Sequence, residues 1–355
     1  MDVHAANSSL ETRDLLDPTI DLDEQASLNR ASRSSVAHEP PVAPGRILLD
    51  RYVLVQVLDA GGACTVFRAR DLEAGRDAPP FVAVKAPALI DAKAPTSAAA
   101  SGTAEHLERQ FEQTRRLAHI GIAEVFDLQR EGDLSFLTME LIEGQSLAAL
   151  FQSYSGAVPL ALTRRILKQV ADALSYAHSV GVIHGHLSPA KVFVLPGDRV
   201  KILGFGNAGD APAASSLAYA SPQVLEGAPA SIEDDIFSFS CMAYELIAGR
   251  HPFGRRSAKE ARADEVRPDP LPQLPEEHSA VLLKGLSWES AARPSDIKAL
   301  AAAILPRREP SSTARKAPAS VVTPAVDRPD DKRWLMLIAA CVVAMIAAVV
   351  MTRMS

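Results

Sequence analysis

The chain has 355 residues, of which 37 are Lys or Arg and 43 are Asp or Glu, so its formal net charge is −6. This weak acidic balance gives no electrostatic reason to expect a nucleic acid partner, and a hydrophobic fraction of 47% excludes global disorder. The cysteines Cys64, Cys241 and Cys341 are too few and too scattered for a disulfide framework or a metal site. We therefore expect a reducing compartment such as the cytosol.

Residues 1–46 mix Asp, Glu, Ser, Arg and Pro without hydrophobic periodicity and end in a Pro-rich stretch at 39–45. They contain no basic start followed by an apolar run, so the pattern is not that of a signal peptide. We expect a disordered leader. A phosphorylation-regulated docking tail around Thr19 is the alternative.

Residues 47–305 have the patterns of a globular domain. Strand-like runs come first, and helix-like periodic segments follow. The strand-like runs are at 52–58, 65–70 and 81–85, and the helix-like segments include 162–178 and 236–248. A β-rich first third followed by an α-rich remainder predicts an α+β fold with two lobes and a cleft between them.

Residues 306–333 contain five prolines and few apolar residues, which predicts an extended tether. The residues at 334–351 then carry no charge and would measure about 27 Å as a helix, enough to cross a bilayer core. We expect a transmembrane helix over 334–352 that anchors the tail. A buried core helix is the weaker alternative, because little chain follows that it could pack against.

The flanks of this span predict its orientation. Five basic residues precede it and one, Arg353, follows it. The preceding ones are Arg315, Lys316, Arg328, Lys332 and Arg333. The positive-inside rule then places the globular domain in the cytoplasm, with a single pass through the inner membrane. Within the span, Ala340, Ala344 and Ala348 fall on one helical stripe and favour a homodimer in lipid, unless alanine is simply common there.

The globular part carries a series of motifs in a fixed order. They are a glycine-containing stretch at 51–71, Val-Ala-Val-Lys at 82–85, His-Gly-His-Leu-Ser-Pro-Ala-Lys at 184–191, Leu-Gly-Phe-Gly at 203–206, Ser-Pro-Gln at 221–223, a largely apolar stretch at 235–253 and Ala-Ala-Arg-Pro at 291–294. This series resembles the bacterial Ser/Thr protein kinases of the eukaryotic-like, Hanks type. The resemblance covers the globular part and neither tail. It implies a small lobe built on an antiparallel sheet and a larger helical lobe.

The positions that serve phosphoryl transfer in that family depart from its pattern. The resemblance places His186 where the family has its catalytic carboxylate, and Lys191 and Gly204 where it has its two metal ligands. Lysine and glycine offer Mg²⁺ no side-chain oxygen, and an imidazole would be a different base. Two of the three glycine positions of the phosphate roof depart as well, because the three read Asp59, Gly61 and Cys64. Gly185 stands where the family has the arginine that receives an activation-loop phosphate.

Other family positions are retained. Lys85 matches the lysine that pairs with phosphates, and its partner on the next helix is left open among Glu108, Gln110 and Glu112. The resemblance implies stacking of His184 on Phe205. It also implies a hydrogen bond from Arg293 to Gln223, which replaces a glutamate, so that the charge pair is lost. A nucleotide pocket, if one forms, would use Lys85, Val66, Ala83, Met139, Glu140, Ile142 and Phe193. Ordinary packing is the alternative role for these side chains.

Taken together, these departures favour a pseudokinase, a kinase-like fold that does not transfer phosphate. We expect a membrane-anchored signalling scaffold or binding module with protein partners, no required cofactor, no metal and no catalytic residue. Weak, metal-independent ATP binding stays open within this hypothesis. The alternative is an ATP-dependent Ser/Thr protein kinase with an unconventional active site built on His186 and Lys191.

Overall fold

The computed structural model describes residues 42–304, apart from 62, 77, 89–96, 155, 207–215 and 255. All of these belong to the first of two compact units, Met1–Arg307. The expected tether at 306–333 and span at 334–352, with Ala340, Ala344 and Ala348, lie outside the described residues, as does most of the leader. Within the described part, no helix combines the length and apolarity needed to cross a membrane.

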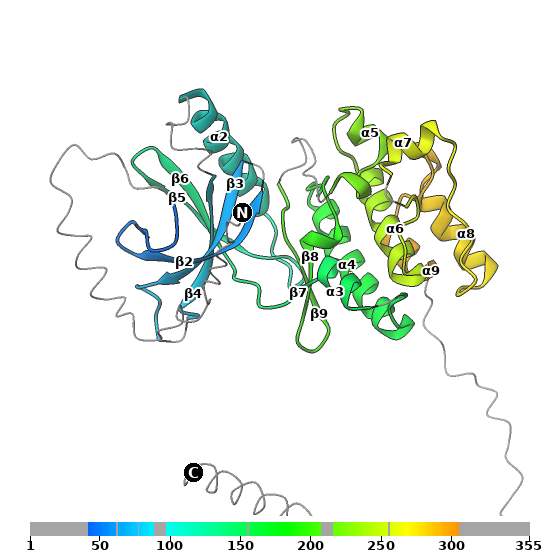
Figure 1. The fold of residues 1–355 in the computed structure, drawn as a ribbon, viewed down its shortest axis with the longest axis horizontal. Coiled ribbons are helices and arrows are strands. Elements are labelled where there is room, and N and C mark those ends of the chain that lie inside the picture. Colours follow the sequence, from blue (N-terminus) through cyan, green and yellow to red (C-terminus); the bar gives the residue numbers. More distant parts are fainter. Residues whose placement is uncertain are drawn as a thin grey trace, which may run out of the picture. The chain divides into compact units, whose positions relative to one another are not determined.

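The first lobe is built on a six-stranded antiparallel sheet with the order β1-β2-β3-β4-β6-β5 (Figure 1). Its strands are β1 (Ile47–Leu48), β2 (Tyr52–Gly61), β3 (Cys64–Asp71), β4 (Phe81–Pro87), β5 (Val125–Glu131) and β6 (Leu134–Met139). The runs predicted at 52–58, 65–70 and 81–85 are confirmed as β2, β3 and β4. Successive side chains point to opposite faces of a strand, which is why the alternating pattern could be read there.

Each face of this sheet packs in its own apolar cluster. One face contributes Phe67, Val84 and Phe136, and the other contributes Cys64, Ala83, Leu137 and Met139. The second cluster also contains Leu107 of helix α2 (Ser97–Thr114), which is fully buried. Residues one turn later share its side of the helix. Because Leu107 packs against the sheet, residue 110, three positions later, also lies on the side of α2 that faces the sheet.

Residues 42–46, which the sequence analysis assigned to the leader, contact the sheet. Gly45 N donates to Leu54 O at 2.7 Å, and Leu54 N donates to Arg46 O at 2.9 Å. Arg46 also pairs with Glu131 at 2.9 Å. The folded domain therefore begins before residue 47, because backbone hydrogen bonds extend the pairing with β2 toward the N-terminus.

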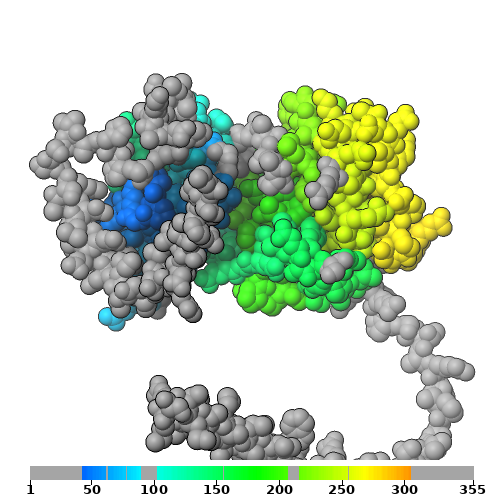
Figure 2. All heavy atoms as spheres, in the orientation of Figure 1, coloured from blue at the N-terminus to red at the C-terminus, as the bar shows by residue number. Residues whose placement is uncertain are grey.

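The second lobe is helical and contains a three-stranded sheet of order β7-β8-β9 (Figure 1). Its strands are β7 (Gln145–Ser146), β8 (Val192–Leu195) and β9 (Arg199–Ile202). Its helices are α3 (Leu147–Ser153), α4 (Leu160–Ser179), α5 (Pro222–Leu225), α6 (Ile232–Ala248), α7 (Ala258–Ala263), α8 (Glu276–Gly285) and α9 (Ile297–Ile304). Three 3₁₀ turns complete the described part of this lobe: η1 (Pro189–Lys191), η2 (Leu217–Tyr219) and η3 (Ser290–Ala292). Figure 2 shows this lobe in green to orange beside the blue and cyan atoms of the first lobe. The helices predicted at 162–178 and 236–248 are confirmed as α4 and α6.

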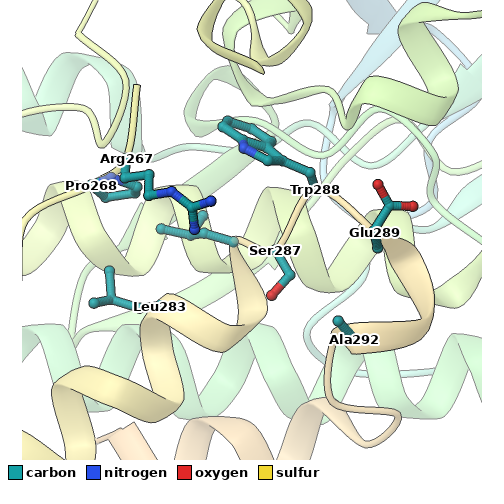
Figure 3. A pocket seen from close by; sticks show the side chains of 8 residues that line it. Arg267, Pro268, Leu283, Ser287, Trp288, Glu289 and Ala292 are labelled. Carbon is teal, nitrogen blue, oxygen red and sulfur yellow. The ribbon is translucent and has the colours of Figure 1, made fainter. Parts of the chain in front are cut away.

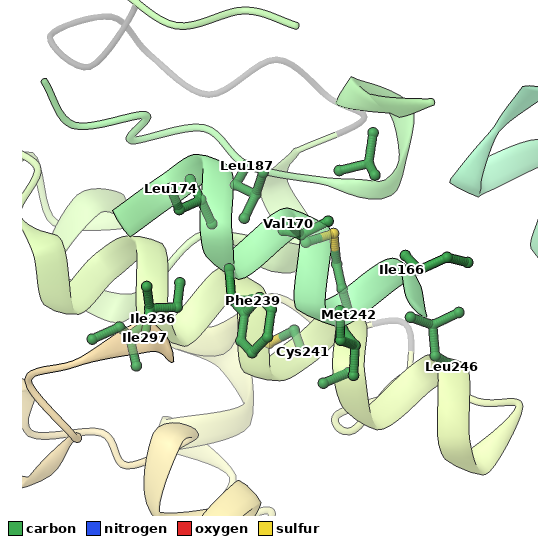
Figure 4. Close-up of a cluster of buried hydrophobic side chains, with 14 of the residues drawn as sticks. Ile166, Val170, Leu174, Leu187, Ile236, Phe239, Cys241, Met242, Leu246 and Ile297 are labelled. Atoms are coloured by element: carbon green, nitrogen blue, oxygen red, sulfur yellow. The ribbon is translucent and has the colours of Figure 1, made fainter. Parts of the chain in front are cut away.

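Helix α6 runs through the core of the second lobe. It is apolar on nearly all sides, and its residues from 234 to 244 are all buried; an all-round apolar helix is stable only in such a central position. Figure 4 shows Met242 and Leu246 of α6 beside Ile166 and Val170 of α4. The expected two-lobed α+β architecture is confirmed for the described residues.

Candidate functional site

Lys85 of β4 and Gln110 of α2 are joined by a hydrogen bond. Lys85 Nζ donates to Gln110 Oε1 at 2.6 Å, and Gln110 Nε2 donates to the Phe205 carbonyl at 3.3 Å. Gln110 is buried, whereas Glu108 and Glu112 are exposed. Of the three partners left open by the sequence, the structure selects Gln110. The lysine therefore meets a neutral amide at the position where the family resemblance implies a carboxylate.

The segment after β9 packs directly on helix α2. Gly206 has a φ of +87°, and a Cβ at this position would lie 2.9 Å from the Cα and the carbonyl oxygen of Gln110. Backbone atoms at that distance cannot move aside cheaply, so this contact requires glycine. No residue spacing predicted the contact, and it holds the neighbouring Phe205 carbonyl within reach of the Gln110 amide.

A buried carboxylate, Asp235 of α6, holds the loop that carries the two candidate-site histidines. Asp235 Oδ2 accepts from His184 N at 2.9 Å, and Oδ1 accepts from Gly185 N at 2.8 Å. His178 Nε2 lies 2.7 Å from Oδ2. Gly185 has a φ of +73°, which favours glycine at this position. The loop is thus held in position by hydrogen bonds to helix α6, independently of any ligand.

The rings of His184 and Phe205 lie against each other as the resemblance implied, with centroids 4.7 Å apart, but their planes are tilted by 54° rather than stacked. His184 Nε2 lies 3.0 Å from the Leu203 carbonyl and Nδ1 accepts from His186 N at 3.3 Å. This pattern assigns the proton to Nε2. Burial lowers the pKa of His184 to about 4, so the ring is neutral at pH 7 and serves packing.

His186, at the position of the family's catalytic carboxylate, is only 8% exposed. The hydroxyl of Ser216 lies 3.4 Å from the His186 carbonyl and 3.2 Å from the Ser188 hydroxyl. Both serines are buried. A general base must come within hydrogen-bond reach of a substrate proton. Here the His186 side chain is largely withdrawn from solvent, an arrangement that the sequence pattern did not indicate.

Lys191 and Gly204, at the two metal-ligand positions, lie against each other. A Cβ on Gly204 would meet Lys191 Cδ at 3.3 Å and Cε at 3.6 Å, and the φ of Gly204 is +88°. Among the described residues, the Lys191 ammonium makes no ion pair. The same part of the chain holds no group of three His, Cys, Asp or Glu side chains that could bind a metal ion.

Three of the predicted pocket residues come together in the first lobe. Val66 lies opposite Lys85 on the paired strands, and Ala83 lies opposite Met139. Their side chains share one apolar cluster with Cys64, the residue at the third roof position. The other two apolar residues predicted at the pocket are Ile142 and Phe193, which are half-buried and lie outside that cluster. Phe193 belongs to β8 of the second lobe.

The carboxylate of Glu140, also predicted at the pocket, is engaged elsewhere. Glu140 Oε2 accepts from Lys201 Nζ at 2.7 Å and from Glu124 N at 3.2 Å. Lys201 Nζ also donates to the Ile122 carbonyl at 3.2 Å. The Glu140 side chain therefore connects the segment after β6, which joins the two lobes, to Lys201 of β9.

Arg293 keeps a charged partner that the sequence analysis did not foresee. Its Nη2 donates to Gln223 Oε1 at 2.7 Å, so the predicted hydrogen bond is confirmed. The charge pair with position 223 is lost as predicted, but Arg293 Nη1 lies 3.2 Å from Asp234 Oδ1 and forms an ion pair there instead. Asp234 supplies the carboxylate because the start of α6 passes beside the arginine.

A cavity of about 450 Å³ lies in the second lobe, away from these residues. Figure 3 shows that Arg267 and Trp288 both line it, together with residues at the end of α8. None of the candidate-site residues contributes to its wall. It is therefore separate from the site built around Lys85 and Lys191.

Comparison with known proteins places the chain among others of this architecture. Residues 52–307 match the family model described as "Protein kinase domain". The "Probable serine/threonine-protein kinase PknB" of Corynebacterium glutamicum is 30% identical over 241 residues, which are 64% of this chain and 36% of that protein. The "Serine/threonine-protein kinase PknB" of Mycolicibacterium smegmatis is 29% identical over 264 residues, 68% of this chain and 40% of that protein. The matched region thus spans about two fifths of the length of these relatives.

A solved structure shares the fold. The crystal structure of the Mycobacterium tuberculosis PknI kinase domain, determined for a point mutant, matches with a TM-score of 0.57 and 24% sequence identity. The match covers 75% of this chain and 98% of that structure. At this level of identity the likeness concerns the two-lobed fold alone.

Proposed function

The chain belongs to the protein kinase domain family, and we propose that it is a member that binds partner proteins at the membrane without transferring phosphate. The observation that carries this proposal is the lack of oxygen ligands at both metal positions, where Lys191 and Gly204 face each other. Phosphoryl transfer depends on metal ions that bridge the phosphates and on a carboxylate that orients the attacking hydroxyl. A fold can persist as a binding module after such groups are lost.

The geometry around Gly204 supports the proposal beyond the residue types. A carboxylate at this position would have to adopt the left-handed φ of +88° and displace the Lys191 side chain. The base position adds a second argument, since His186 is 8% exposed. Each of these losses alone is expected to slow phosphoryl transfer by two or more orders of magnitude.

An active Ser/Thr protein kinase is the second candidate function, and the names of the relatives favour it. Both PknB proteins are named as serine/threonine-protein kinases and are 29–30% identical to this chain. In that case His186 would act as the base and Lys191 would replace the charge of a metal ion. The retained pair of Lys85 with α2 is compatible with this alternative.

Incubation of the full chain with radiolabelled ATP, Mg²⁺ or Mn²⁺ and a generic protein substrate separates the two functions. We expect no incorporation above a blank without protein, which places the rate at least about 10⁴-fold below that of an active kinase. Lys85→Met is the matched control. Autophosphorylation by the parent chain that disappears in Lys85→Met would establish the active kinase instead.

The membrane part of the proposal concerns residues 334–352, with the kinase-fold domain in the cytoplasm. Deleting residues 334–355 should release a folded protein into the soluble fraction, because the apolar clusters described above are formed by residues between 42 and 304. Fractionation of cells that express the full and shortened chains measures this. A shortened chain that still sediments with membranes would show that another segment provides the anchor.

A further inference from the structure

The cavity at the end of α8 has an apolar wall that the fold itself puts in place. Leu283, Leu286 and Pro268 line it, and the indole of Trp288 forms another side (Figure 3). The Trp288 ring packs on Phe253 of the core with centroids 4.8 Å apart, which fixes its position from within the lobe. Apolar surface in a concave site of this kind suits an apolar side chain of a ligand.

The backbone beneath this wall is held by side chains of the core. The Trp288 carbonyl accepts from Gln223 Nε2 at 2.8 Å, and the Ser287 carbonyl accepts from Arg293 Nε at 2.9 Å. Arg293 is in turn paired with the buried Asp234. Because the wall is ordered before anything binds, a ligand loses little free energy to ordering the protein.

Two hydrogen-bond donors at the cavity have no partner. Arg267 is exposed and makes no ion pair within the described part of the chain. Asp269, two positions later, and Glu289, which lines the cavity, are each paired with another arginine, at 2.8 and 3.1 Å. The indole N–H of Trp288 likewise donates to no acceptor among these residues. An unpaired guanidinium beside such an N–H favours a carboxylate.

A ligand that fits both features carries an apolar side chain with carboxylates next to it. One stretch of the leader has this composition, the stretch around Thr19. Residues 14–24 read Asp-Leu-Leu-Asp-Pro-Thr-Ile-Asp-Leu-Asp-Glu, with five carboxylates and no basic residue. In extended backbone, neighbouring side chains point to opposite sides. Ile20 and Leu22 would then share one side, and the acidic side chains between and after them would lie on the other.

This stretch is long enough to reach the cavity within one chain. The described residues begin at Val42, 20 positions after Leu22. At about 3.4 Å per residue, that length of chain spans at most about 68 Å. A compact domain of about 260 residues is roughly 47 Å across. The covalent connection therefore permits the contact.

We propose that residues 14–24 of the leader dock in this cavity of the same chain. The apolar side chains of Ile20 and Leu22 pack on Leu283 and Trp288, and a neighbouring carboxylate pairs with Arg267. The leader then covers this surface of the second lobe. A protein segment of the same chemistry from outside has to displace it, so the leader regulates access to the cavity.

Titration of a fluorescein-labelled peptide of residues 14–24 into the full chain, kept in detergent micelles, tests the proposal. The double variant Ile20→Ser, Leu22→Ser removes the apolar contacts of the tethered leader and should free the cavity. We expect the peptide to bind this variant about tenfold more tightly than the parent, because a tethered segment competes at a high effective concentration. Fluorescence anisotropy measures both affinities.

Two further variants, each added to the double variant, test the cavity itself. Arg267→Gln should weaken peptide binding about fivefold, because the carboxylate loses its charged partner. Arg199→Gln is the matched control, an exposed position of β9 that makes no ion pair in the described part of the chain. It should leave the affinity unchanged. Neither guanidinium holds a carboxylate in the fold, so both variants are expected to fold like the parent.

Several outcomes would overturn the proposal. Equal affinity for the parent and the double variant would show that the leader does not occupy the cavity. So would a peptide that binds neither chain. Unchanged affinity in Arg267→Gln, or equal affinity of a scrambled peptide of the same composition, would show that the peptide binds elsewhere or by charge alone. Occlusion in the parent that disappears on dilution would assign the bound leader to a second copy. No outcome depends on phosphate transfer, so the proposed function is tested separately.

Discussion

Asp235→Ala is expected to lower the free energy of unfolding by about 3–5 kcal/mol. Asp235 is fully buried and accepts from His184 N and Gly185 N at 2.9 and 2.8 Å, with His178 Nε2 at 2.7 Å. Alanine would leave these three groups buried without their acceptor, and a buried polar group without a hydrogen bond destabilises the folded state. Urea denaturation followed by tryptophan fluorescence measures the change.

Asp269→Ala is the control for this prediction. Asp269 pairs with Arg250 at 2.8 Å on the surface, where its side chain is 73% exposed. Exposed ion pairs contribute little, so we expect a loss below about 1 kcal/mol. Equal losses in the two variants would show that Asp235 does not hold the loop. A loss of secondary structure at room temperature in Asp235→Ala alone would fit the upper end of the expected range.

Acidification from pH 7 to pH 4 is expected to lower the free energy of unfolding by several kcal/mol. Burial lowers the pKa of both His184 and His251 to about 4, against about 6.5 in the unfolded chain. The unfolded state therefore binds more protons in this window. The stability from these groups is fully present above pH 6.5 and is lost as the pH falls toward 4. Each histidine contributes roughly 3 kcal/mol over this range.

Denaturation curves at a series of pH values check this prediction. His251→Asn removes one of the two rings with the most strongly lowered pKa and should clearly reduce the slope of the free energy of unfolding between pH 6 and pH 4.5. The pKa of Asp71 is lowered by its hydrogen bond to Arg51, so its contribution is lost at lower pH, below the histidine window. A free energy of unfolding that stays constant between pH 6.5 and pH 4.5 would contradict the burial of these rings.

Local patterns in the sequence were sufficient to predict much of the fold. Alternating side chains at 65–70 and 81–85 predicted two central strands, and 236–248 predicted the helix now seen at the centre of the second lobe. The order of motifs then pointed to the family, and the residue types at 186, 191 and 204 already showed that oxygen ligands are missing there. Such statements depend on residue identity and short-range periodicity, which any stretch of chain displays by itself.

The partners of individual side chains were decided only by tertiary packing. Glu108, Gln110 and Glu112 all stayed open as partners of Lys85 until the burial of Leu107 set the rotation of α2 about its axis. Glu140 reaches Lys201, 61 residues away, in the structure. The contact between Glu140 and Lys201 has no counterpart in local spacing.

The same holds for the charges that compensate substitutions. Arg293 recovers a carboxylate from Asp234, 59 residues before it, after the expected glutamate is replaced by Gln223. Lys191 covers Gly204 because the loop after α4 and the end of β9 are brought together by the β8–β9 pairing. A sequence specifies which groups a chain carries, but the balance of charge at a site depends on distances between remote segments, and those are set by how the elements pack.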